Sequence, residues 1–245
     1  MNSTINNLII NRKWLYQIPR ISIYIFIILN LCAMLLYPGG TISQKNNQMN
    51  NYSFTEGYSF SENFFSDLGS TEAHNGQINF FSSFFFNLSL IIVGITMFLF
   101  HLNLYDIFKG TKLNLIVLVA GICGCIGGLC FVGVGLTPSN LYLPMHIVFN
   151  DWAFRSYFLC ALLTTAIIFK SDKLDNSYSI LYILFSISIL LYIFILEFAP
   201  SPTDSNEWLR IHVIAQKFIV FCFIFSTHLL SIGFLNYFRT NNKIT

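Results

Sequence analysis

The side chains of this chain that could do chemistry gather near one end of its apolar segments. Three of them are the cations Arg155, Arg210 and Lys217, and such groups hold phosphates and carboxylates through charge-assisted hydrogen bonds. The same region contributes acids and histidines, namely Asp67, His74, His146, Asp151, Glu197 and His212. This set of residues predicts a polar site that binds a lipid headgroup or another small anionic ligand.

Their spacing indicates which of these side chains face the protein. Asp151 and Arg155 are four residues apart and can pair along one face of a helix. Arg210 and Lys217 share one face of a later segment, while His212 lies on the opposite face. Since a helix in lipid cannot turn two polar faces outward, at least one face points into the protein.

Four interpretations of this cluster stay open. One interpretation of the charges is a set of interhelical salt bridges at a wet interface. Another is binding of the anionic ligand, which is the leading hypothesis for function. In a metal-dependent intramembrane hydrolase, His74, His146 and His212 would hold zinc with Asp67 or Asp151, although no H-x-x-x-H or H-E-x-x-H spacing occurs. The scarcity of soluble segments would also suit an accessory subunit of a membrane complex. We assign no catalytic residue, metal or cofactor.

The composition places these residues in a membrane protein. Of the 245 residues, 55% are hydrophobic and 10% are charged, and the mean hydropathy is +0.63. A membrane-crossing helix needs about 20 apolar residues. The chain therefore predicts an all-α, polytopic bundle of six transmembrane helices, over residues 21–37, 78–102, 113–136, 144–170, 178–198 and 204–238. Residues 1–20 and 239–245 would be terminal tails, and residues 21–37 a retained anchor rather than a cleaved signal.

Positive charge gives the orientation. Cytoplasmic segments are rich in Lys and Arg, and nine of the thirteen such residues fall on one side: Arg12, Lys13, Arg20, Lys109, Lys112, Lys170, Lys173, Arg239 and Lys243. We therefore expect a multi-pass cell-membrane protein with both termini inside and the loop 38–77 outside. Asn51 would be a glycosylation acceptor on the correct side.

The net charge of +2, without a basic run, gives no reason to expect nucleic acid as a partner. The expected partners are membrane lipids and, as an alternative, another membrane protein.

The outer loop is predicted to contain a short interfacial helix over residues 58–69. Ser59 and Glu62 have the spacing of a capping box, as do Asp204 and Glu207 before the last span. Gly69 would take a positive φ and fold the loop back over the bundle. Asp67 would then lie above Asn79 and pair with Arg155 or Arg210.

Two helices show further patterns. Asn79, Ser83 and Asn87, spaced by four, draw a polar stripe inward from the outer end of residues 78–102. Gly124 and Gly128 have the G-x-x-x-G spacing, which allows close approach of helix backbones. This spacing favours packing inside one chain over a homodimer seam.

The segment Phe65-Ser-Asp-Leu-Gly-Ser70, followed by Asn79 and Phe86-Asn-Leu-Ser-Leu90, resembles the S-[DE]-L-G motif and second helix of the membrane family known as domain of unknown function 998. The segment Gly133-Val-Gly-Leu-Thr-Pro138, followed by His146, resembles the glycine-rich third helix of that family, which ends in a proline turn before a histidine. This sequence departs from the family's pattern after Pro138, where an acidic residue is expected and the chain has Ser-Asn140. A weaker likeness to the six-helix Frag/DRAM proteins implies a lipid-associated role. The positions that match the motifs are Ser66, Asp67, Gly69, Asn79, Asn87 and His146.

Overall fold

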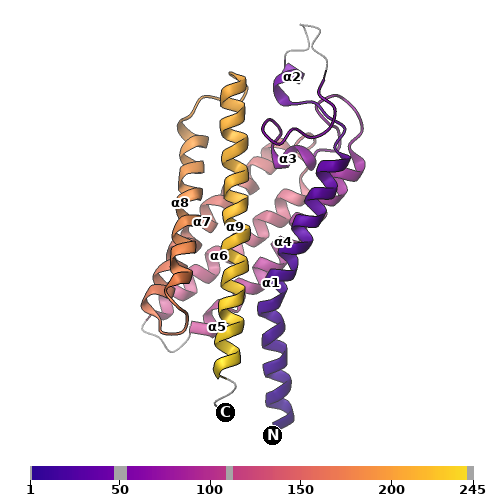
Figure 1. The fold of residues 1–245 in the computed structure, drawn as a ribbon. Helices are drawn as coiled ribbons and strands as arrows, with labels where there is room; N and C mark the ends of the chain where they lie inside the picture. Colours follow the sequence, from indigo (N-terminus) through magenta and orange to yellow (C-terminus); the bar gives the residue numbers. More distant parts are fainter. Residues whose placement is uncertain (1, 47–53, 109–112, 242–245) are drawn as a thin grey trace.

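The protein is a bundle of long helices that run side by side, with a folded loop at one end (Figure 1). The computed structural model describes residues 2–46, 54–108 and 113–241, with side chains except at 2–16, 106, 238, 239 and 241. The helices are α1 (Asn2–Leu36), α2 (Ile42–Asn46), α3 (Phe65–Leu68), α4 (Phe80–Leu102), α5 (Leu104–Phe108), α6 (Asn114–Leu136), α7 (Leu143–Lys170), α8 (Ser177–Phe198) and α9 (Asn206–Asn241).

Six of these helices, α1, α4, α6, α7, α8 and α9, are long and apolar enough to cross a membrane. The predicted all-α bundle with six membrane-spanning helices is thus confirmed. Both termini lie at the same end of the bundle (Figure 1), as an even number of crossings requires. We call this the terminal end, and the end that carries residues 37–79 the loop end.

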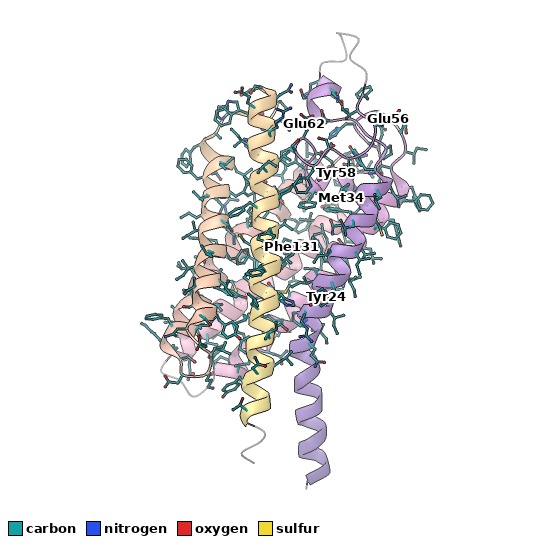
Figure 2. All side chains as sticks on the ribbon, viewed as in Figure 1. Tyr24, Met34, Glu56, Tyr58, Glu62 and Phe131 are labelled. Carbon is teal, nitrogen blue, oxygen red and sulfur yellow. The ribbon has the colours of Figure 1, made fainter. Side chains whose placement is uncertain are left out.

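The six long helices form a closed ring. Each packs against the next long helix along the chain, and α9 packs against α1 to close the ring. Aromatic side chains fill the middle: the rings of Phe131, Tyr157 and Phe223 lie 5.1 to 5.7 Å apart between centroids. Phe131 is seen inside the bundle in Figure 2. These rings surround a small apolar cavity of about 60 Å³ between the helices.

Glycines on α6 allow α4 to approach closely. A Cβ atom on Gly128 would lie 2.7 Å from the backbone nitrogen of Phe98 and 2.8 Å from the carbonyl oxygen of Gly94, and one on Gly124 would collide with the ring of His101. The G-x-x-x-G pair therefore packs inside the chain, as predicted. It is not available as a homodimer seam.

Helix α1 shows the largest difference from a predicted boundary, and α9 lacks its predicted capping box. Helix α1 begins at Asn2 rather than at residue 21, because residues 2–18 contain no glycine or proline to stop it. Its apolar span is Gln17–Leu36. Helix α9 begins at Asn206, and the Ser205 hydroxyl accepts the Trp208 N–H at 3.2 Å, so the predicted capping box of Asp204 is wrong.

The loop also differs in detail. Of residues 58–69, which were predicted to form a helix, only Phe65–Leu68 are helical. The predicted capping box at Ser59 is wrong because the Ser59 N–H donates to Asn63 Oδ1 (2.9 Å) in a turn. Gly69 has a φ of −81°, so the predicted positive φ is wrong. It must be glycine for a steric reason, since a Cβ there would lie 2.6 Å from Asn87 Oδ1. Asn51, Lys109, Lys112 and Lys243 lie outside the described residues.

Replacing Gly128 by valine should lower the thermal stability of the bundle. The added carbons meet backbone atoms of α4 that cannot rotate away, and overpacking of this kind costs roughly 1–3 kcal/mol. The measurement is the unfolding temperature of the purified protein in detergent. Leu129→Val on the exposed face of the same helix is the control and should leave that temperature nearly unchanged.

Candidate functional site

The loop is fixed to α4 through its own backbone. The carbonyl oxygens of residues 68–70, where α3 ends, accept hydrogen bonds of 2.8 to 3.2 Å from side chains of Asn79, Ser82, Ser83 and Asn87. The polar stripe predicted on this helix is thus the surface that receives the S-D-L-G segment. Three further bonds join Ser70 and Thr71 to Ser139 and Asn140 in the α6–α7 turn.

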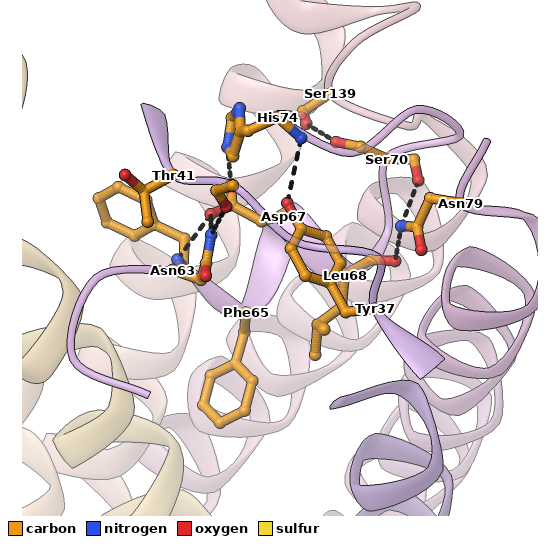
Figure 3. Close-up of polar contacts among 12 residues, drawn as sticks. Tyr37, Thr41, Asn63, Phe65, Asp67, Leu68, Ser70, His74, Asn79 and Ser139 are labelled. Carbon is orange, nitrogen blue, oxygen red and sulfur yellow. Dashed lines mark hydrogen bonds and ion pairs between the residues drawn. The ribbon is translucent and has the colours of Figure 1, made fainter. Parts of the chain in front are cut away.

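Asp67 is the centre of the loop (Figure 3) and is only 8% exposed. One of its carboxylate oxygens accepts the Asn63 Nδ2–H at 3.1 Å and the Phe64 N–H at 2.9 Å. The other lies 3.1 Å from His74 Nε2, which is within ion-pair distance. The geometry of that contact is not that of a hydrogen bond, and His74 Nε2 is buried without an aligned partner. Asp67 therefore holds the loop together: its carboxylate accepts the Phe64 N–H at the start of α3 and lies against His74.

Two tyrosines close the space around Asp67. The Tyr37 hydroxyl accepts the His74 backbone N–H at 3.3 Å, and the Tyr58 hydroxyl donates to the Asn63 carbonyl at 3.1 Å. Burial raises the pKa of both phenols, and the negative charge of Asp67 raises each pKa further. Both tyrosines thus stay neutral hydrogen-bonding groups at physiological pH.

Lys217 on α9 is the second centre of the loop contact, and it is 6% exposed. Its Nζ donates to the Asn63 carbonyl oxygen at 2.5 Å. The same nitrogen lies 5.0 to 5.4 Å from the ring centroids of Tyr58, Phe60 and Phe65. A carbonyl and three aromatic faces thus stabilise an ammonium that forms no ion pair with any described carboxylate. Asp67 is close enough for its charge to act on it.

Helix α9 holds the loop at further points. Gln216 Oε1 accepts the Phe65 N–H at 2.9 Å, and Arg210 pairs with Glu62 at 2.6 Å. Glu62 and Tyr58 lie beside α9 at the loop end (Figure 2). The prediction that Asp67 pairs with Arg155 or Arg210 is therefore wrong. Asp67 reaches groups of its own loop, because the loop turns the carboxylate inward.

Arg155 belongs to a separate ionic cluster on α7 and α8. It pairs with Asp151 at 3.3 Å, as the spacing of four predicted, and with Glu197 at 2.5 Å. All three side chains are partly exposed. The predicted residues Asp151 and Arg155 thus lie together, away from the contacts of Asp67.

The three histidines considered for zinc engage different partners. His146 Nδ1 lies 2.7 Å from the Thr137 carbonyl oxygen, and His212 Nε2 lies 2.9 Å from the Pro200 carbonyl oxygen. His74 Nε2 lies 3.1 Å from an Asp67 carboxylate oxygen. Within the described residues, no group of three His, Cys, Asp or Glu side chains could hold a metal ion. Asp67 is close enough for its charge to act on His146, so these two predicted residues share one region.

A groove beside the loop was not predicted from the sequence. It has a volume of about 430 Å³ and lies along α4 at the loop end. Its lining is Thr71, Ile78, Phe80, Ser83, Phe84, Asn87, Leu88, Ile91 and Pro138. The nearest signal in the sequence is the run of phenylalanines that follows Asn79, of which Phe80, Phe81 and Phe84 are exposed.

Replacing Lys217 by methionine should loosen the loop without unfolding the bundle. The change keeps much of the side chain's apolar bulk but removes the ammonium from its carbonyl and aromatic contacts, which together stabilise the docked loop by about 2 kcal/mol. Hydrogen exchange of residues 58–67 should therefore become roughly 30-fold faster. Lys45→Met, at a more exposed position of the same loop, is the matched control. Unchanged exchange in Lys217→Met would contradict this role.

Comparisons with known proteins assign no family. No protein-family model, curated protein or solved structure matches the chain. The likeness of residues 65–70 to the S-[DE]-L-G motif stays a prediction. Functional inference therefore rests on the loop contacts and on the groove beside them.

Proposed function

We propose that this chain is a multi-pass cell-membrane protein that binds a membrane lipid at its outer face, in the groove beside the loop. The observation that carries the proposal is the groove itself, which lies on a membrane-spanning helix at the loop end. By the positive-inside rule, the terminal end is cytoplasmic and the groove belongs to the outer leaflet.

The walls of the groove suit a lipid. Ile78, Phe80 and Phe84 are 84%, 65% and 53% exposed, so their side chains face the lipid around α4. Leu88 and Ile91 continue the apolar wall toward the middle of the span. Its volume falls within the usual range for small-molecule sites, and its lining is mostly apolar with a few polar groups, as is typical of such sites.

The cations predicted to hold an anionic headgroup are engaged elsewhere. Arg155 and Arg210 form ion pairs with carboxylates, and Lys217 is enclosed by the loop. An anion would have to displace these partners. The apolar body of the lipid, rather than a charged headgroup, is therefore what the groove is built to hold.

The metal-dependent hydrolase has less geometric support. Its proposed ligands His74, His146 and His212 would each have to leave a different partner before they could share one ion. The groove needs no such rearrangement.

Replacing Leu88 by tryptophan tests the proposal, because the larger ring fills the groove from its wall. Native mass spectrometry of the protein purified from membranes should show bound lipid reduced by about ten-fold or more, which corresponds to roughly 1.4 kcal/mol of lost affinity. The control is Leu129→Trp, which adds the same ring to an exposed face of α6 outside the groove. If both variants carry as much lipid as the native chain, the proposal fails.

A further inference from the structure

We infer that the groove selects a neutral lipid with a hydroxyl headgroup, and that Asn87 Oδ1 accepts the hydrogen bond from that hydroxyl. This inference rests on the proposed function and names the class of lipid. The candidates of this class are diacylglycerols and sterols, which share an uncharged hydroxyl on an apolar body.

The orientation of the Asn87 amide is fixed by its neighbours. Its Nδ2 donates to the Gly69 carbonyl at 3.0 Å and to Ser83 Oγ at 3.1 Å. Because a carbonyl oxygen can only accept, the nitrogen must face Gly69 and the amide cannot be reversed. The acceptor Oδ1 is the other polar atom of the amide, and it takes no part in these two hydrogen bonds.

That acceptor remains open. Asn87 Oδ1 accepts no hydrogen bond from the described residues, and it is not among the fully buried polar atoms that lack a partner. Asn87 lines the groove and its Oδ1 is not fully buried, so we infer that a ligand in the groove reaches this oxygen. An open acceptor calls for a donor, and a lipid hydroxyl provides one.

Thr71 offers the complementary group at the rim. Its Oγ1 accepts the Asn140 Nδ2–H at 2.9 Å, which leaves the hydroxyl hydrogen free to donate to a second oxygen of the ligand. Thr71 also lines the groove and is exposed. An ester or hydroxyl oxygen of the lipid would suit this donor.

Charge argues against an anionic or zwitterionic headgroup at Asn87. No residue that lines the groove carries a charge. Asn87 lies seven residues after Phe80, which is about 10 Å along the helix axis and inside the span. A phosphate at that depth would find no cation in the groove, and isolated charges are strongly disfavoured there.

The experiment uses the purified full chain in phosphatidylcholine vesicles that contain one photoactivatable probe at a fixed mole fraction. The probes are a diacylglycerol, a sterol and a phosphatidylglycerol. At least one neutral probe should label residues 78–91 about five-fold more than phosphatidylglycerol does, the discrimination expected from one hydrogen bond. The comparison between diacylglycerol and sterol identifies which source of the hydroxyl the groove takes.

Variants separate the effect of the hydroxyl contact on labelling from the effects of groove shape and of loop docking. Asn87→Leu should lower labelling by the preferred neutral probe about five-fold, and Thr71→Val should lower it less. Asn79→Ala is the matched control, since it also frees loop carbonyls but lies outside the groove lining. Because the loop supplies Thr71 to the groove, Asn79→Ala should lower labelling somewhat, but by clearly less than Asn87→Leu does.

The outcomes distinguish this inference from the proposed function. If Leu88→Trp blocks labelling but Asn87→Leu does not, the groove binds lipid and the hydroxyl inference is wrong. It is also wrong if phosphatidylglycerol labels as well as both neutral probes, or if Asn79→Ala reduces labelling as much as Asn87→Leu. If Leu88→Trp leaves labelling by every probe unchanged, the proposed function fails with it.

Discussion

The loop end depends on the need to satisfy the backbone carbonyls that end α3. Residues 68–70 are buried against α4, where water is scarce, and an unpaired carbonyl in such a place costs several kcal/mol. Asn79, Ser82, Ser83 and Asn87 supply the donors. The polar residues of an otherwise apolar helix are explained by this requirement, and the position of the loop follows from it.

A second constraint is the charge of Lys217. A buried ammonium must be stabilised locally, and here the loop provides a carbonyl and three rings. Because these groups come from residues 58–65, the lysine has them only when the loop is docked. Together, α4 and α9 hold the loop from two sides, and Asp67 joins the two contacts through Asn63.

The sequence predicted the spans well because apolar length decides them. It also identified Asp67, Asn79, Asn87 and Lys217 as residues of interest, since polar side chains in such segments are costly. It could not predict their partners. Asp67 was expected to reach an arginine, but the turn at residues 59–63 directs its carboxylate to Asn63 and His74. Such a turn depends on tertiary contacts that leave no periodic pattern.

The groove was missed for a related reason. Its walls come from α4, from Thr71 in the loop and from Pro138 after α6, which lie together only once the loop is folded. Local periodicity shows the apolar face of α4 but cannot show that a hollow borders it. The exposed phenylalanines look like ordinary lipid-facing residues until these other walls are in place.

Gly69 connects the loop with the groove. Its carbonyl takes the Asn87 donor, and its missing side chain leaves room for Asn87 Oδ1, which a Cβ atom would approach to 2.6 Å. A larger residue would displace the amide and lose the carbonyl contact and the open acceptor together. The glycine of the S-D-L-G segment is therefore required by packing rather than by backbone conformation. The same small residue that lets the loop dock keeps the acceptor of the proposed lipid site in place.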